Sequence, residues 1–93
     1  FRSEIARWAL EFDRRAEKDF GRLPSADRDR IRRFFDDRLL KLDDPRSLGG
    51  PLHGSLAGLW KYRIGDIRVI AEIRQERLII LVVQIGNRRE IYR

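Results

Sequence analysis

The stretch LWKYRIGDIRVI, residues 59–70, decides the fold because apolar and charged side chains alternate on both sides of a Gly-Asp pair. Alternation with a period of two indicates β-strands that bury one face. Two such strands joined by two turn-forming residues predict a tight antiparallel hairpin, with strands at 59–64 and 67–74. The same stretch carries three cations, Lys61, Arg63 and Arg68. A function for the protein has to account for this concentration of positive charge.

Successive side chains of a strand point to opposite faces, so the positions of the cations predict where they lie. Trp60 and Tyr62 are expected to face the interior, whereas Lys61, Arg63 and Arg68 share the opposite face. Two interpretations remain open for the hairpin alone. The cations form an ordinary solvated sheet face, with Arg68 paired to Glu72 on the same side. Alternatively, they form a surface that holds phosphate.

The residues before the hairpin predict one strand followed by two helices. RWALEF, residues 7–12, alternates like a half-buried strand and places Trp8 in the core. Asp13 is a helix N-cap for the first helix, and Pro24-Ser25 separates it from a second helix at about 25–42. The Asp43-Asp44-Pro45 sequence ends that helix. This half of the chain is therefore expected to be a strand and a helical hairpin.

The residues after the second helix predict a long connector and a β-meander. PRSLGGPLHGSLAG, residues 45–58, is rich in Gly, Pro and Ser and is expected to cross the surface. A third meander strand is predicted at 77–84 after a tight turn at Gln75-Glu76, and a short last strand at 89–92. We therefore expect a single α+β domain over residues 1–93 with a mostly antiparallel sheet.

The composition indicates an acidic or polyanionic partner. The 93 residues have a net charge of +6 and a pI of about 10.7, which suits nucleic acid, an anionic membrane or an acidic protein. Residues 1–54 hold 13 basic and 11 acidic side chains, whereas 55–93 hold 8 and 4, so the meander carries +4 of the +6. No signal-peptide pattern is visible, and the longest apolar run, 78–83, is too short to span a bilayer. These features favour a cytoplasmic protein, and we expect no membrane among its partners.

Several classes of chemistry are excluded by the residues that are missing. The chain has no cysteine, so disulfides, thiolate catalysis and Cys-based metal sites are ruled out. His53, in the connector, is the single histidine, which excludes a ribonuclease mechanism based on two histidines. No acidic cluster indicates a metal site, and we expect no metal and no cofactor. His53 itself is either a surface turn residue or a contact to RNA.

The second predicted helix carries a run of arginines: Arg28, Arg30, Arg32, Arg33 and Arg38. Such a run is usually a solvated helix face. The alternative is docking to ribosomal RNA, which would rest on phosphate contacts and would depend strongly on salt.

Over nearly its whole length the chain resembles the RelE-type toxins of the RelE/ParE superfamily of toxin–antitoxin systems. The resemblance rests on LEFDRRAEKDFGRLP, LHGSLAGLWKYRIGDIRVIAEI and VVQIGNRREIY. The ordered combination of L-x-G-x-x-x-G-x-W-[KR]-x-R-x-G-x-x-R with a terminal G-x-R-x-x-[IV]-Y is its most specific part. The resemblance implies a toxin that cleaves mRNA in the ribosomal A site through attack of a ribose 2′-OH on the adjacent phosphate.

The resemblance also implies which residues act in this reaction. The catalytic set falls on Lys61, Arg63, Arg68, Arg88 and Tyr92. In this set Arg63 and Arg68 hold the phosphate, Tyr92 or Lys61 acts as the base, and Arg88 assists the leaving group. The set expected to contact RNA or the ribosome is Arg28, Arg32, Arg33, His53, Asn87 and Arg89. Asn87 departs from the pattern, because many relatives have His or Lys there.

The partners implied are a RelB-like antitoxin, mRNA and the small ribosomal subunit, with operator DNA bound only through the antitoxin complex. Two alternatives remain open on the same fold. One is a ParE-like poison of DNA gyrase, a branch that generally lacks the terminal Tyr. The other is a catalytically inactive module that only binds antitoxin.

Overall fold

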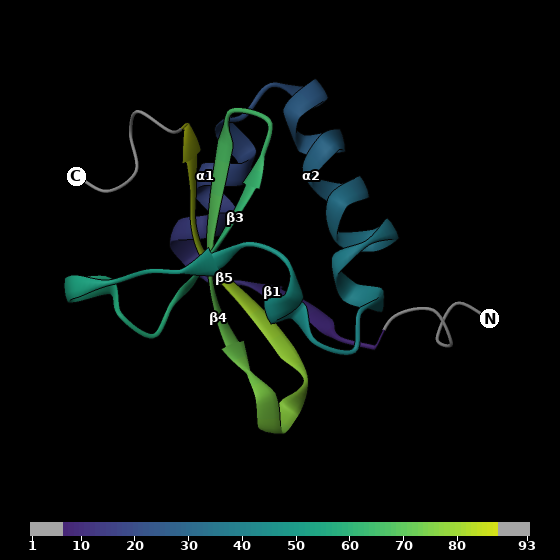
Figure 1. Cartoon of the computed structure of the whole chain (residues 1–93). Coiled ribbons are helices and arrows are strands. Elements are labelled where there is room, and N and C mark those ends of the chain that lie inside the picture. Colours follow the sequence, from purple (N-terminus) through teal and green to yellow (C-terminus); the bar gives the residue numbers. More distant parts are fainter. Residues whose placement is uncertain (1–6, 88–93) are drawn as a thin grey trace.

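The computed structural model describes residues 7–87, which form two α-helices and one five-stranded sheet (Figure 1). The helices are α1 (Arg14–Arg22) and α2 (Ser25–Asp37). The strands are β1 (Ala9–Phe12), β2 (Gly50–Pro51), β3 (Trp60–Ile64), β4 (Ile67–Arg74) and β5 (Ile79–Asn87). The order across the sheet is β1-β5-β4-β3-β2, and among residues 7–87 only the β1–β5 pair is parallel. The predicted α+β class with a mostly antiparallel sheet is confirmed.

The helical hairpin is confirmed, but its second helix is shorter than predicted. The Asp13 carboxylate caps α1 by accepting the Ala16 N–H at 2.9 Å. Helix α2 ends at Asp37 because Arg38 leaves the helical region, at φ −125° and ψ −68°. A 3₁₀ turn, Leu39–Lys41, follows and buries both of its leucines. Because the apolar pattern continues through this turn, the periodicity of the sequence predicted a helix that reached residue 42.

The main core lies between the helices and one face of the sheet. Ala16 from α1 and Ile31 and Phe35 from α2 are buried there. The buried side chains that the central strands contribute are Tyr62, Ile64, Ile67, Val69, Ala71, Ile80, Val82 and Ile85. Trp8 is 2% exposed, and Trp60 is partly buried against the same cluster. The interior positions predicted for the three residues Trp8, Trp60 and Tyr62 are therefore confirmed.

Strand β5 contains a bulge that the alternation of residues did not predict. Ile70 of β4 pairs with Gln84, but Ala71 pairs with Val82, so Val83 is an extra residue in β5. The core-facing side chains therefore switch phase along β5, from Val82 to Ile85, and Gln84 does not enter the core. The strand runs from 79 to 87 rather than 77–84.

The turn before β5 also differs from the prediction. A 3₁₀ turn, Gln75–Arg77, replaces the tight turn expected at Gln75-Glu76, and Leu78 ends it in the left-handed conformation at φ 54°. The last strand predicted at 89–92 lies outside the described residues.

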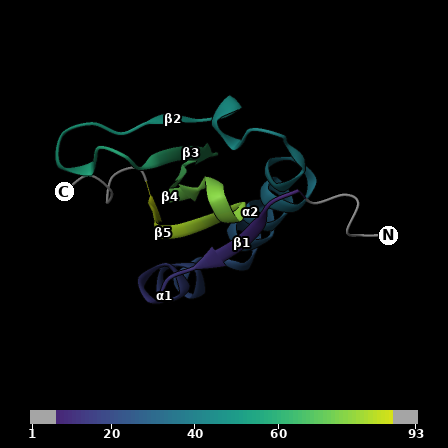
Figure 2. The same cartoon turned by 90° about the horizontal axis from the view of Figure 1, so that it is seen from below.

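The connector wraps around the β3 edge of the sheet (Figure 2). On the helix side Leu48 packs against the main core. The chain then crosses the edge, where β2 pairs with β3 through Gly50 opposite Lys61. On the other side Leu52, Leu56 and Leu59 form a second cluster with Ile70 and Val83, in which Ile70 is 1% exposed. The connector therefore covers part of the face that was predicted to be solvated.

Tyr62 attaches the start of the connector to the sheet. Its side chain is fully buried, and its hydroxyl donates a 2.7 Å hydrogen bond to the carbonyl oxygen of Pro45. Burial raises the pKa of the Tyr62 phenol well above its usual value, because the charged phenolate would lose its hydration. The phenol therefore stays neutral and keeps its donor proton throughout the physiological range.

Replacing Tyr62 with phenylalanine is expected to lower the free energy of unfolding at pH 7 by about 1 kcal/mol, because the Pro45 carbonyl loses its donor. The wild type should also lose stability as the pH rises above about 10, the ordinary pKa of tyrosine, since the unfolded state then ionises and the folded state does not. Urea titrations at neutral pH and above pH 10 measure both effects. In the Phe variant the free energy of unfolding should fall less above about pH 10, because residue 62 can no longer ionise. If it falls as much as in the wild type, other groups cause the alkaline instability.

Candidate functional site

The three hairpin cations lie on the sheet face opposite the helices, and we call Lys61, Arg63 and Arg68 the cationic face. In the β3–β4 register Arg63 lies directly opposite Arg68, and Lys61 lies opposite Ile70. The two-residue Gly65-Asp66 turn keeps this register, with Gly65 at φ 62° as the first central residue of a type II′ hairpin requires. The predicted common face is therefore present in the structure.

The Arg63–Arg68 pair is electrostatically unfavourable as it stands. Side chains directly opposite each other on antiparallel strands approach within about 5 Å, and like charges there are destabilising. Arg63 is exposed, whereas Arg68 is partly buried and its Nε atom has no hydrogen-bond partner among residues 7–87. A buried donor without a partner costs free energy. An anion seated between the two guanidinium groups would remove the repulsion between them.

The ordinary explanation for Arg68, an ion pair with Glu72, is wrong. Glu72 instead accepts from Arg74, at 3.3 Å from Oε2 to Nε. Within the described part of the chain, no carboxylate forms an ion pair with Arg63 or Arg68. The positive charge of this pair is therefore not neutralised by the side chains that the structure describes.

The remaining predicted contact residues lie at different places. His53 is exposed at the start of the 3₁₀ turn Gly54–Leu56, next to Leu52, which packs beside the cationic face. Asn87 pairs with Ile67 and so belongs to the helix side of the sheet. It lines a separate hollow of about 450 Å³, together with Asp19 and Asp27. The structure does not bring Asn87 to the cationic face.

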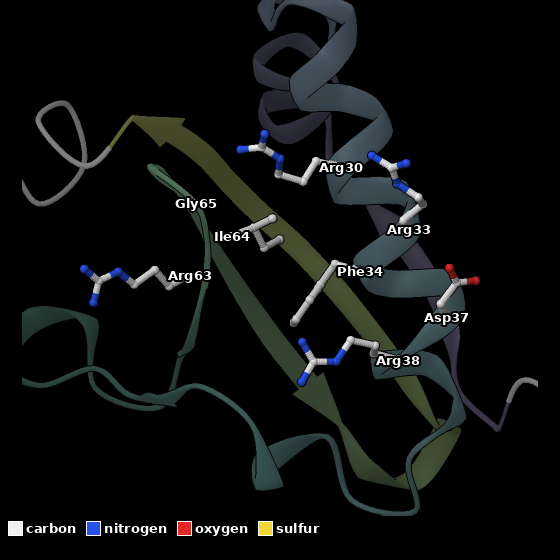
Figure 3. Close-up of a pocket in the computed structure, with 8 residues that line it drawn as sticks. All are labelled: Arg30, Arg33, Phe34, Asp37, Arg38, Arg63, Ile64 and Gly65. Atoms are coloured by element: carbon white, nitrogen blue, oxygen red, sulfur yellow. The ribbon is translucent and has the colours of Figure 1, made fainter.

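Two of the α2 arginines have partners within the protein. Arg28 donates from Nη1 to the Leu23 carbonyl oxygen and so closes the turn between the helices. Arg32 lies over the Phe20 ring at 5.2 Å and contacts Asp29 at 3.4 Å. Arg33 instead lines a groove between α2 and the end of β3 (Figure 3). The three α2 residues of the set expected to contact RNA or the ribosome therefore have three different environments.

A second group of cations was missed by the sequence analysis. Arg14, Arg15, Lys18 and Arg22 are all exposed and share one side of α1, opposite the buried Ala16. Their spacing of one, three and four residues places them within about a quarter turn of one another. The helical period applied to the first predicted helix would have revealed this stripe.

Arg88, Arg89 and Tyr92 lie outside the described residues, so the structure does not place three of the predicted site residues. Within residues 7–87, no group of three or more metal-binding side chains is found. None of the helices in this range has the length and apolar content needed to cross a bilayer.

Comparison with known proteins identifies the fold. The chain is similar to the toxin–antitoxin complex RelBE2 from Mycobacterium tuberculosis, with a TM-score of 0.79, 23% identity, and coverage of 89% of this chain and 93% of the other. It is also similar to the isolated RelE toxin of E. coli, with a TM-score of 0.67, 21% identity, and coverage of 86% and 83%. The archaeal RelE–RelB complex from Pyrococcus horikoshii gives a TM-score of 0.68, 24% identity, and coverage of 90% and 98%. At these identities the likeness shows a shared fold.

Sequence comparison identifies the family. No curated protein sequence matches the chain. The family described as "ParE toxin of type II toxin-antitoxin system, parDE" matches residues 10–92. This match takes in both helices, the cationic face and all of the sheet except Ala9, the first residue of β1. The protein therefore belongs to the ParE toxin family of type II toxin–antitoxin systems, within the RelE/ParE superfamily.

Proposed function

We propose that the protein is a toxin that cleaves mRNA in the ribosomal A site and holds the scissile phosphate on its cationic face. The observation that carries the proposal is the Arg63–Arg68 cross-strand pair, which has no carboxylate partner among residues 7–87. Arginine remains charged at any physiological pH and binds phosphate oxygens through a planar fork. Two forks facing each other suit a phosphate that gains negative charge as it becomes five-coordinate.

The proposed reaction needs no metal. A base removes the proton of the ribose 2′-OH, and the 2′ oxygen attacks the adjacent phosphorus. The bond from phosphorus to the 5′ oxygen breaks, and a proton donor supplies that oxygen with its hydrogen. The products are a 2′,3′-cyclic phosphate and a 5′-hydroxyl. Arg63 and Arg68 stabilise the phosphorane, which is the term that usually contributes most in such reactions.

The resemblance to RelE-type toxins supplies the positions of the residues proposed for proton transfer, and the chemistry of their side chains supplies the roles. Tyr92 or Lys61 acts as the base, and Arg88 assists the leaving oxygen. Lys61 is the one of these three that the structure describes, and it lies on the same sheet face as Arg63.

The proposed partners are mRNA and the small ribosomal subunit, together with a RelB-like antitoxin that neutralises the toxin. Similar toxin structures are complexes named RelBE or RelE–RelB, which supports an antitoxin partner for this chain. We propose contacts to RNA or the ribosome for the exposed residues Arg33 and His53, and for Asn87, Arg89, Arg28 and Arg32. Operator DNA would be bound only through the antitoxin complex, in the cytoplasm.

Poisoning of DNA gyrase is the second candidate, favoured by the family description, which names parDE. One pair of experiments separates the two functions. Toeprinting on programmed ribosomes with the purified chain should give mRNA 3′ ends within the A-site codon, while a gyrase supercoiling assay should show no trapped DNA cleavage. Trapped DNA with intact mRNA would reverse the assignment. Neither effect, with antitoxin binding retained, would identify an inactive binding module.

A further inference from the structure

Asp19 of α1 is hydrogen-bonded to β5, 66 residues further along the chain. Its Oδ2 atom accepts the backbone N–H of Ile85 at 3.0 Å, in a partly buried setting. Asp19 lies three residues after Ala16, the buried residue of α1, so it lies at the border between the helix and the sheet. A carboxylate that accepts a backbone N–H makes a stronger bond than a neutral acceptor does. The bond therefore ties α1 to one point of β5.

This point of β5 lies beyond the strand that pairs with the same side. Strand β1 pairs with β5 only from Ile79 to Val82, and after Phe12 the chain turns into α1 (Figure 2). Asp19 thus supplies the acceptor that a neighbouring strand supplies elsewhere in a sheet. The bond comes shortly after the bulge in β5, where the phase of the strand changes. Asp19 therefore fixes the course of β5 after its bulge.

The ordinary explanation for an aspartate on a basic helix is an ion pair with a neighbouring cation. Asp19 lies beside Arg15, Lys18 and Arg22, which line the same surface hollow on α1. Within residues 7–87, however, none of the ion pairs involves Asp19. Neutralisation of the α1 cations therefore does not account for its position.

The end of β5 after this bond leads to the proposed site of cleavage. Gly86, the residue after Ile85, lies directly opposite Arg68 of the cationic face. Arg88, which is proposed to assist the leaving oxygen, is the second residue after Gly86, and Tyr92, a proposed base, follows it in the sequence. A shift of the backbone at Ile85 would therefore be passed along the chain to residues that act on the phosphate.

We infer that Asp19 is a positioning residue for mRNA cleavage: by holding the Ile85 amide it fixes the end of β5, and with it the place of Arg88 and Tyr92 relative to the cationic face. This inference rests on the proposed function for the reaction itself. Asp19 lies on the helix side of the sheet, so it acts through the backbone of β5 and does not touch the RNA. A misplacement of reacting groups by about 1 Å is enough to lower a rate about 10²-fold.

Asp19→Ala removes the acceptor, and Asp13→Ala is its matched control. Both variants lose one negative charge of the same region and one bond from a carboxylate to a backbone N–H, since Asp13 caps α1 at the Ala16 amide. The bond of the Asp13 carboxylate stays within the helix, whereas that of Asp19 reaches β5. Asp19→Asn keeps an oxygen that can accept the same bond. Urea titrations define conditions in which all three variants are folded, and the other measurements are made there.

Single-turnover cleavage on programmed ribosomes, at varied toxin concentration, separates the rate at saturation from binding to the ribosome. We expect Asp19→Ala to lower the rate at saturation by about tenfold or more and to change the half-saturating concentration by less than about twofold. Asp19→Asn should cleave within about threefold of the wild-type rate, and Asp13→Ala within about twofold. In hydrogen exchange followed by NMR, the Ile85 amide should exchange at least about tenfold faster in Asp19→Ala than in Asp13→Ala.

An equal loss of rate in Asp19→Ala and Asp13→Ala would reduce the effect to stability or charge and overturn the inference. So would a higher half-saturating concentration at an unchanged rate, which would assign Asp19 to ribosome binding. An Ile85 amide that stays protected in Asp19→Ala would also overturn it, because the bond would then not hold β5. A wild type that leaves mRNA intact would refute the proposed function instead, and exchange of the Ile85 amide would still decide whether Asp19 holds the end of β5.

Discussion

Replacing Arg68 with methionine is expected to lower the rate of ribosome-dependent mRNA cleavage by about 10²- to 10³-fold while making the protein more stable. The loss of rate follows from removing one guanidinium that stabilises the phosphorane. The gain in stability has two causes. Arg63 loses the like charge directly opposite it, and the unpaired Nε of Arg68 disappears. Methionine keeps the unbranched aliphatic stem, so packing along β4 changes little.

The free energy of unfolding is expected to rise by about 1 kcal/mol, which for a chain of this size raises the melting temperature by about 5 °C. Single-turnover cleavage on programmed ribosomes and thermal melts of the isolated chain measure the two effects separately. Together they test whether the cationic face is maintained at a cost in stability, as functional sites often are.

Arg74→Met is the matched control, because Arg74 is on the same strand but forms an ion pair with Glu72. This variant should cleave mRNA normally, and its stability should fall slightly or stay unchanged. If Arg68→Met destabilises the chain as Arg74→Met does, the Arg63–Arg68 pair is not strained. Full cleavage by Arg68→Met would remove Arg68 from the reaction.

The faces of the hairpin could be predicted from the sequence because a two-residue turn leaves little freedom of register. Once Gly65-Asp66 was recognised as the turn, alternation placed Lys61, Arg63 and Arg68 together and Tyr62 inside. The helical hairpin could also be predicted from local signals, because the Asp13 cap and the break at Pro24 each depend on only a few neighbouring residues. Interactions between neighbours in the sequence therefore account for the parts that were predicted correctly.

The features that were missed depend on segments distant in sequence. The alternation along β4 predicts that Ile70 lies on the solvated face. Ile70 is buried because Leu52 and its neighbours in the connector pack over it. The bulge at Val83 is visible only in the pairing of β5 with β4, where Ile70 lies opposite Gln84 and Ala71 opposite Val82. Likewise, the arginine pattern of α2 predicts a solvated helix face. Only the position of the end of β3 beside the helix makes some of these arginines line a groove. A pattern along one segment does not identify which distant segment packs against it.

Substitution of Gly49 is expected to have the second large effect, a loss of stability, because the connector crosses the edge of β3 at this residue. Its backbone is left-handed at φ 72°, and a Cβ there would fall 2.2 Å from the Lys61 carbonyl oxygen and 2.9 Å from Cδ1 of Tyr62. Gly49→Ala would therefore force the connector away from the sheet. The hydrogen bond from Trp60 Nε1 to the Leu48 carbonyl, 2.7 Å long, would be lost with it.

We expect Gly49→Ala to lower the free energy of unfolding by about 3–5 kcal/mol, as the sum of a left-handed alanine, the backbone clash and the lost hydrogen bond. Gly54→Ala is the control, since Gly54 is also left-handed, at φ 66°, but has nothing within 4 Å of the added Cβ. It should cost only about 1–2 kcal/mol. Urea denaturation of both variants isolates the clash as their difference. Equal costs would mean that the connector can move at the edge of β3 without loss of stability.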